Sequence, residues 1–142
     1  MVVNGIVAAV LTVESISDIK TKSISLARLV CYMIVALALN IIMRYQSFIS
    51  LFGGIIVGVI FLGFGILTKE GIGYGDGAIF ICLGAVLGLN DNLRLLMYSL
   101  MLAAIVGGIY ALVRKKNLKV RIPFIPCVLI TYVVMTLVGV IV

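Results

Sequence analysis

The sequence predicts an all-α membrane protein, a bundle of about six transmembrane helices with the N and C termini outside. Apolar residues make up 64% of the 142 residues and charged residues only 11%, against about 25% charged in soluble domains. The apolar residues fall into six long runs joined by short polar connections. Six helices of about 20 residues use nearly the whole chain, so residues 1–142 are expected to form a single domain.

The ends of the chain and its paired glycines support the interpretation of the six runs as helices. The first lacks a basic start and an Ala-x-Ala cleavage site, so it is expected to be a retained helix rather than a signal peptide. The last begins at Pro123, a residue suited to the first position of a helix. Two pairs of glycines at four-residue spacing, Gly54 with Gly58 and Gly84 with Gly88, are typical of close helix–helix packing. The expected helices are Val2–Ser17, Ser25–Met43, Phe48–Leu67, Gly77–Leu89, Leu93–Val113 and Pro123–Val142.

The basic residues predict the orientation of the bundle. Nine of the eleven lie in or beside the first, third and fifth connections, and only Arg44 and Arg94 lie in the other two. Basic residues are enriched in short loops on the cytoplasmic side of a membrane. The odd connections are therefore expected to face the cytoplasm, in a multi-pass protein of the cytoplasmic (inner) membrane. A cluster in the fifth connection is expected to contact anionic lipid headgroups rather than nucleic acid. It consists of Lys115, Lys116, Lys119 and Arg121.

Metal and disulfide chemistry have few residues to draw on. The chain has no histidine, and Cys31, Cys82 and Cys127 each lie inside an apolar run without a Cys-x-x-Cys pair. Such cysteines are expected to pack as small apolar residues. The sequence therefore predicts no metal site and no cofactor.

The acidic residues are the candidates for chemistry, since an ionisable group at membrane depth marks a functional site by default. There are five: Glu14, Asp18, Glu70, Asp76 and Asp91, and only Asp91 is expected outside. The runs that carry Asp18 and Asp76 would rise about 25 Å and about 22 Å as helices, less than the bilayer's hydrocarbon thickness of about 30 Å. Both carboxylates are therefore expected several ångströms inside the cytoplasmic boundary, at similar depth.

Asp76 ends a glycine-rich segment. Gly73, Tyr74, Gly75 and Gly77 surround it, and glycine allows a second backbone to approach closely. These four residues are expected to shape a loop or bind an extended substrate, as a strand adds to a sheet edge. Taken by itself, the segment is more typical of a flexible turn with Asp76 as a helix cap.

Asp18 supplies the second carboxyl group. Peptide hydrolysis without a nucleophile or metal needs two carboxyl groups around one water, one acting as base and the other as acid. Two carboxyl groups held close share a proton and titrate as a pair. Asp18 and Asp76 lie far apart in the chain, so helix packing must bring them together. Glu14 lies one turn before Asp18 on the same helical face, and is either a modulator of the Asp18 proton or a structural partner of Asn4 or a hydroxyl.

Three motifs together resemble the type IV prepilin peptidase family, membrane aspartyl proteases with a GxGD signature. Gly73-Tyr74-Gly75-Asp76 resembles the signature, and Asp18-Ile19-Lys20-x-Lys22-x-Ile24 resembles the segment of the first catalytic aspartate. Arg121-Ile122-Pro123-Phe124-Ile125-Pro126 resembles the entry to the last helix. The resemblance implies that Asp18 and Asp76 cleave basic leaders from type IV pilin-like precursors at the cytoplasmic face.

The chain also departs from the family pattern. Ser25-Leu26 stands where Pro-Asn is common, and Gly77-Ala78 stands where Val-Lys is usual. The short form lacks the cysteine-bearing segment linked to N-methylation in larger members, so no methyltransferase activity is expected.

Two other functions remain open. One is a non-catalytic scaffold or assembly subunit of the same fold, which only the geometry of the two aspartates distinguishes from a protease. The other is a small transporter or channel, but transporters place their charges near the midplane of the membrane. In this chain Glu14, Asp18 and Asp76 are all expected near one face, which favours the protease.

Overall fold

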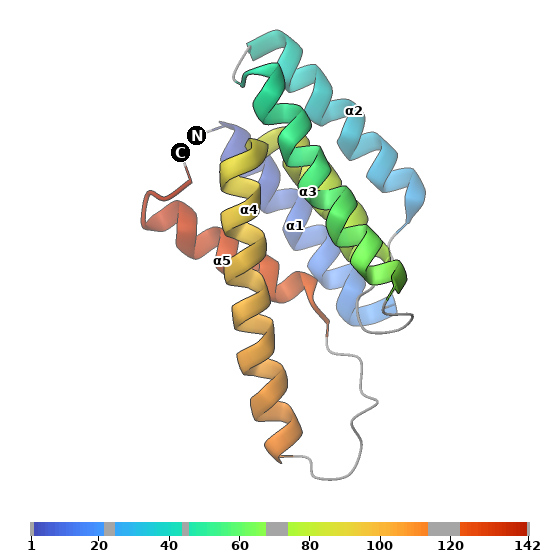
Figure 1. Ribbon diagram of the computed structural model, residues 1–142, viewed down its shortest axis with the longest axis vertical. Helices are drawn as coiled ribbons and strands as arrows, with labels where there is room; N and C mark the ends of the chain where they lie inside the picture. Colours follow the sequence, from blue (N-terminus) through green and yellow to red (C-terminus); the bar gives the residue numbers. More distant parts are fainter. Residues whose placement is uncertain (1, 22–24, 44–45, 68–73, 114–122, 142) are drawn as a thin grey trace.

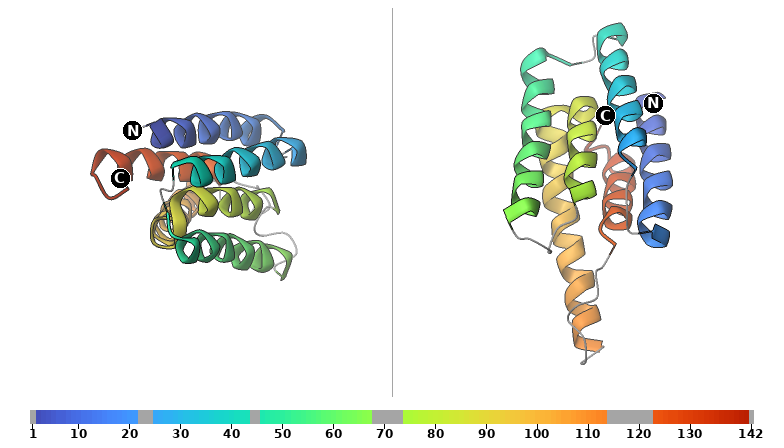
Figure 2. Two further views of the ribbon diagram at one scale, coloured as in Figure 1. Left: turned by 90° about the horizontal axis from the view of Figure 1, so that it is seen from above. Right: turned by 90° about the vertical axis from the view of Figure 1, so that its right-hand side faces the viewer.

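The computed structural model describes residues 2–21, 25–43, 46–67, 74–113 and 123–141. These residues form five helical elements (Figure 1), and Figure 2 shows α1 and α3 on opposite sides of the bundle with the other elements between them. The elements are α1 (Val2–Thr21), α2 (Leu26–Met43), α3 (Phe48–Leu67), α4 (Tyr74–Val113) and α5 (Ile125–Leu137).

The element α4 is two helices joined by a sharp reversal at Gly88. Gly88 has φ 75° and ψ −174°, a backbone conformation that is essentially confined to glycine. The Asn92 side-chain amide donates to the carbonyl of Phe80 over 3.2 Å, although these residues would lie about 18 Å apart in a straight helix. The chain therefore folds back, and the second arm extends beyond the rest of the bundle (Figure 1). The predicted connection at Asn90–Asn92 was wrong, because glycine makes the turn and these residues are helical.

Polar side chains of α3 and of the residues just before it cap the reversal. The Gln46 amide donates to the carbonyl of Val86 over 2.7 Å, at the end of the first arm. Ser50 Oγ accepts the N–H of Leu89 over 3.3 Å, at the start of the second arm. Helix ends leave such backbone groups without partners inside the helix, so these two side chains satisfy both sides of the break.

Glycines bring α3 and the first arm of α4 into backbone contact. A Cβ at Gly84 would meet the carbonyl of Gly54, and a Cβ at Gly58 would meet the backbone nitrogen of Ile81. The predicted close packing at these glycines is confirmed. Gly88 has a different role from the one predicted, since it makes the turn.

We expect Asn92→Ala to destabilise the fold by about 1–3 kcal/mol, because the buried Asn92 amide also donates to the carbonyl of Gly54 over 3.0 Å. Unfolding in detergent micelles, followed by circular dichroism, measures the change. Asn90→Ala, at an exposed position two residues away, is the control and should change stability by less than about 0.5 kcal/mol. Equal stability of the two variants would show that Asn92 does not hold the reversal.

The last helix is shorter than the predicted Pro123–Val142. Helix α5 ends at Leu137, and Gly139 has φ 76°. The N–H of Gly139 bonds to the carbonyl of Thr136 over 3.2 Å, and the N–H of Val140 bonds to that of Met135 over 2.9 Å. This pair of bonds is a Schellman motif, which closes a helix at a left-handed glycine.

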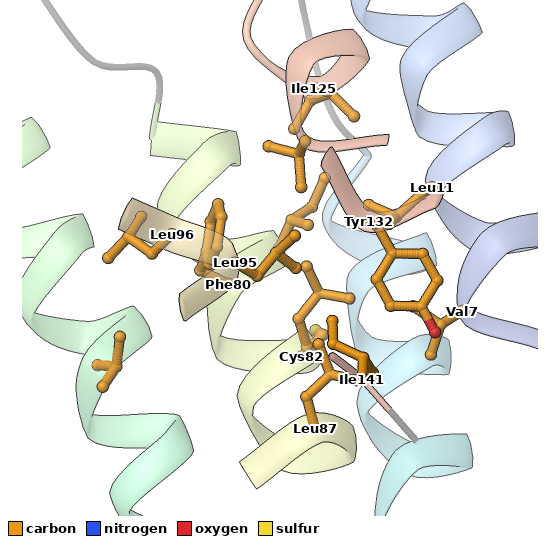
Figure 3. Packing of buried hydrophobic residues seen from close by; sticks show 14 of the residues in the cluster. Val7, Leu11, Phe80, Cys82, Leu87, Leu95, Leu96, Ile125, Tyr132 and Ile141 are labelled. Atoms are coloured by element: carbon orange, nitrogen blue, oxygen red, sulfur yellow. The ribbon is translucent and has the colours of Figure 1, made fainter. Parts of the chain in front are cut away.

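A mainly apolar core joins α1, α5 and both arms of α4. Tyr132 of α5 is 1% exposed, and Figure 3 shows its ring beside Val7 and Leu11 of α1. The Tyr132 hydroxyl reaches the side-chain oxygen of Asn4 over 3.5 Å. Since Asp18, at the other end of α1, contacts the first residue of α5, the two helices run antiparallel.

Many of the described residues on the outer surface are large and apolar, as is typical of a surface in contact with lipid. On α3, Phe48, Phe52, Ile56, Ile60 and Phe64 are each more than half exposed and follow one helical face. Among the described residues, two stretches are long and apolar enough to cross a membrane, Phe48–Leu67 and Tyr74–Leu112, and the second contains the reversal. The all-helical class is confirmed, and the two long apolar stretches fit a membrane protein, whereas the six spans and the outside termini stay predictions.

Candidate active site

Asp18 lies inside α1 rather than after it. The predicted helix ended at Ser17, but α1 continues to Thr21, so Asp18 stands at a fixed place on a helical face. Glu14 and Ser15 are buried on the same face, and Asp18 is only 9% exposed. Rigid backbone on both sides therefore directs this carboxyl group into the bundle.

The first residue of α5 binds Asp18. The backbone N–H of Ile125 donates to Asp18 Oδ2 over 3.3 Å. N–H groups in the first turn of a helix have no partner inside it, and this end of the helix dipole favours an anion. Pro126, the next residue, has no N–H to offer. Asp18 therefore caps α5 from a different helix.

Asp76 lies in the first turn of α4 and is also 9% exposed. One turn further on is Phe80, whose ring centroid is 6.1 Å from that of Phe124, the residue before Ile125. The Phe124 ring also contacts Phe61 of α3, with a centroid distance of 5.9 Å. The start of α5 thus contacts Asp18 directly and packs on the turn of α4 that follows Asp76. Both predicted aspartates are buried, and the start of α5 contacts the helix that carries each of them.

Glu14 is fully buried, and its partners lie on α2. Its Oε1 is 3.1 Å from Arg28 Nε and accepts the hydroxyl of Tyr32 over 3.0 Å. The Arg28 contact is an ion pair rather than an aligned hydrogen bond, and Glu14 Oε2 has no hydrogen-bond partner in the described part of the chain. Of the predicted structural partners, the hydroxyl is found, whereas Asn4 lies beside Tyr132.

Arg28 and Tyr32 were missed as site residues. Arg28 was counted among the charges that set topology. It lies in α2, where its side chain is 39% exposed and its guanidinium forms an ion pair with Glu14. One signal was available: Arg28 and Tyr32 are four residues apart, so both project from one face of α2. Tyr32 also lines an apolar cavity between α1, α2 and the first arm of α4, together with Val7, Ile79 and Leu83.

The glycine-rich segment is only partly described. Gly73 lies outside the described residues, as do Lys115, Lys116, Lys119 and Arg121. Tyr74 is 59% exposed and Gly75 is half-buried at the start of α4. Gly77 is buried, and a Cβ there would come within 2.6 Å of the Cα of Leu62. The departure from the family pattern at Gly77 thus has a steric reason, because α3 leaves no room for a side chain.

Within the described ranges, no three His, Cys, Asp or Glu side chains lie together as they would around a metal ion. The groups that the site offers for chemistry are carboxyl groups, a guanidinium, hydroxyls and a backbone N–H.

Comparison with known proteins identifies the family. The profile of the type IV leader peptidase family matches residues 5–112, which include Asp18, Asp76 and the whole of the segment between them. No curated protein and no solved structure matches the chain significantly. The matched region covers most of the chain and ends before α5. The chain belongs to the type IV leader peptidase family.

Proposed function

We propose that the protein is a membrane aspartic endopeptidase that removes basic leader peptides from type IV prepilin-like precursors at the cytoplasmic face of the inner membrane. Asp18 and Asp76 are its catalytic residues. The observation that carries the proposal is the start of α5, which binds Asp18 and packs one turn from Asp76. Two buried carboxyl groups beside one segment, in a family of leader peptidases, fit an acid–base pair.

The proposed reaction uses one water between the two aspartates. The ionised carboxylate removes a proton from the water, whose oxygen attacks the carbonyl carbon of the scissile peptide bond. The protonated partner donates its proton to the carbonyl oxygen. Collapse of the tetrahedral intermediate then breaks the C–N bond. The leaving nitrogen takes a proton from the aspartate that received one from the water, and a hydroxyl of the intermediate returns a proton to the other aspartate, which restores the singly protonated pair. Two carboxyl groups sharing one proton provide both roles at neutral pH.

The precursor's two parts fit different regions of the proposed enzyme. Its hydrophobic segment would lie against the apolar helices, and the junction with the leader would reach the aspartates. Binding energy from the hydrophobic segment, which is remote from the cleaved bond, would hold that bond in place. The inward-facing site rests on the nine basic residues that predict cytoplasmic connections.

Co-expression with a candidate precursor tests this function. The probe is a short protein with a basic leader, a glycine at the junction and one hydrophobic helix. We expect the leader to be lost with the wild-type enzyme, and mass spectrometry to find a free, unmethylated amine at the new N-terminus. A precursor whose basic leader residues are replaced by Ser is the control. If a panel of precursors with basic leaders is left uncleaved by the wild-type protein, the scaffold or assembly subunit becomes the favoured function.

A further inference from the structure

Arg28 of α2 contacts two side chains of α1 that are one helical turn apart. Its Nε lies 3.1 Å from Glu14 Oε1, and its Nη2 donates to Ser17 Oγ over 2.8 Å. Glu14 and Ser17 are three residues apart, hence neighbours on the surface of α1. The residue after Ser17 is Asp18. The Arg28 side chain therefore binds the last turns of α1, just before the candidate catalytic aspartate.

Stability alone explains this arrangement poorly. Glu14 is 0% exposed, its Oε2 has no hydrogen-bond partner among the described residues, and Arg28 Nε makes no aligned hydrogen bond. The ion pair of the buried Glu14 carboxylate with the partly exposed Arg28 guanidinium leaves atoms unsatisfied, and such a pair is often no more stable than two apolar side chains of similar size. Such a pair is better suited to fixing one arrangement of the helices than to strengthening the fold.

Other packing between α1 and α2 is incomplete near the contacts that Arg28 and Tyr32 make with α1. An apolar cavity separates α1 from α2 on the side toward the N-terminus of α1, and Tyr32 stands at its border. Packing against α2 is therefore incomplete along that part of α1. The contacts of Arg28 and Tyr32 with α1 lie between this cavity and Asp18.

We propose that Arg28, acting through Glu14 and Ser17, is a positioning residue that sets the orientation of Asp18. The proposal rests on the proposed function and specifies what Glu14 does in it. Asp18 is then held from two directions, since Arg28 fixes the helix that carries it and the N–H of Ile125 binds its carboxylate. A rotation of α1 would move the carboxylate away from the water, and a misplacement of about 1 Å can cost about 100-fold in rate.

The double variant Glu14→Leu/Arg28→Met separates positioning from stability. Either single change to an apolar residue leaves one charge unpaired, whereas the double change removes both charges. We expect the double variant to unfold in detergent at close to the wild-type temperature. Its kcat for leader removal should fall by about 10–100-fold, while KM changes less than about twofold. A folded double variant with the wild-type kcat would overturn the proposal.

A milder variant decides the matter if the double variant does not fold. Ser17→Ala removes one of the two anchors, and we expect kcat to fall by about 3–10-fold with KM unchanged. Ser17→Thr, which keeps the hydroxyl, should restore kcat. The matched control is Thr12→Ala, because the exposed Thr12 hydroxyl donates within α1, to the carbonyl of Ala8 over 2.7 Å.

Equal kcat values for Ser17→Ala and Thr12→Ala would also overturn the positioning role. This outcome differs from a failure of the proposed function. If the wild type cleaves the precursor and Asp18→Asn does not, the aspartate pair stands and only the role of Arg28 is lost. If the wild type cleaves nothing, the proposed function itself is wrong.

Discussion

Asp18→Asn and Asp76→Asn should each reduce leader removal by about 10³-fold or more while the protein remains folded and inserted in the membrane. General acid–base catalysis contributes about 10²–10⁴-fold for each participating group, and an amide can neither take nor give the proton. Asn is similar in size to Asp, and its side-chain oxygen can still accept the N–H of Ile125 that Asp18 accepts over 3.3 Å. The measurement is the rate of leader loss with purified enzyme and precursor, with unfolding in detergent followed in parallel.

Asp91→Asn is the matched control for these two variants. Asp91 pairs with the exposed Arg94 over 3.5 Å and lies beyond the reversal at Gly88, about 18 Å along the first arm from Asp76. The same chemical change there should leave the rate unaltered. Full activity of either Asp18→Asn or Asp76→Asn would refute the dyad, and equal losses in all three variants would point to a general effect of charge.

The two aspartates were selected from the sequence by two arguments together. The chain has five acidic residues and no histidine, so the spacing of the apolar runs left few candidates, and the resemblance to the prepilin peptidase motifs then singled out Asp18 and Asp76. Their catalytic role stays a prediction. The predicted end of the first helix was wrong. Lys20 and the residues around it read as a polar connection, but the helix continues to Thr21, since nothing in Ser17-Asp18-Ile19-Lys20 breaks a helix.

The reversal in α4 was placed near the right residue and for the wrong reason. Asn90-Asp91-Asn92 reads as a polar loop, yet Asn92 is buried and donates to two backbone carbonyls. The turn occurs at Gly88, which also belongs to a pattern typical of helix packing. Local sequence does not tell a packing glycine from a turning glycine, because the difference depends on Gln46 and Ser50, which cap the break from elsewhere in the chain.

Contacts between distant segments were beyond the sequence. The motif that contains Pro123 lies at the entry to the last helix, but the helix begins at Ile125 rather than at Pro123, and the proline in its first turn is Pro126. Nor did the motif indicate that Ile125 would bind a side chain of α1. In the same way, positive charge near a helix end is usually a topology signal, and Arg28 fits that pattern until its partner Glu14 is seen. Pairings of this kind follow from tertiary packing, which a single sequence does not display.

Gly84→Ala and Gly54→Ala should each destabilise the protein by about 3 kcal/mol or more. This is the largest loss of stability that we expect of any single change. A Cβ at Gly84 would meet the backbone carbonyl of Gly54, and a Cβ at Gly54 would meet that of Gly84. Backbone inside two packed helices cannot rotate away as a side chain does, so the helices must separate. Separation would also disturb Asn92, whose amide donates to the carbonyl of Gly54.

Gly63→Ala tests whether this cost is steric. Gly63 lies on the same helix as Gly54, but a Cβ there would meet nothing within 4 Å. Replacing glycine by alanine inside a helix is otherwise favourable by about 0.5–1 kcal/mol, so this variant should be as stable as the wild type or slightly more stable. Unfolding in detergent measures the stability of all three variants.

The same variants should also differ in activity. The first arm of α4 carries Asp76 at its start, and Gly84→Ala would open the contact between this arm and α3. Leader removal should therefore be lost with Gly84→Ala and kept with Gly63→Ala, whereas wild-type stability of Gly84→Ala would mean that the two backbones do not meet at these glycines.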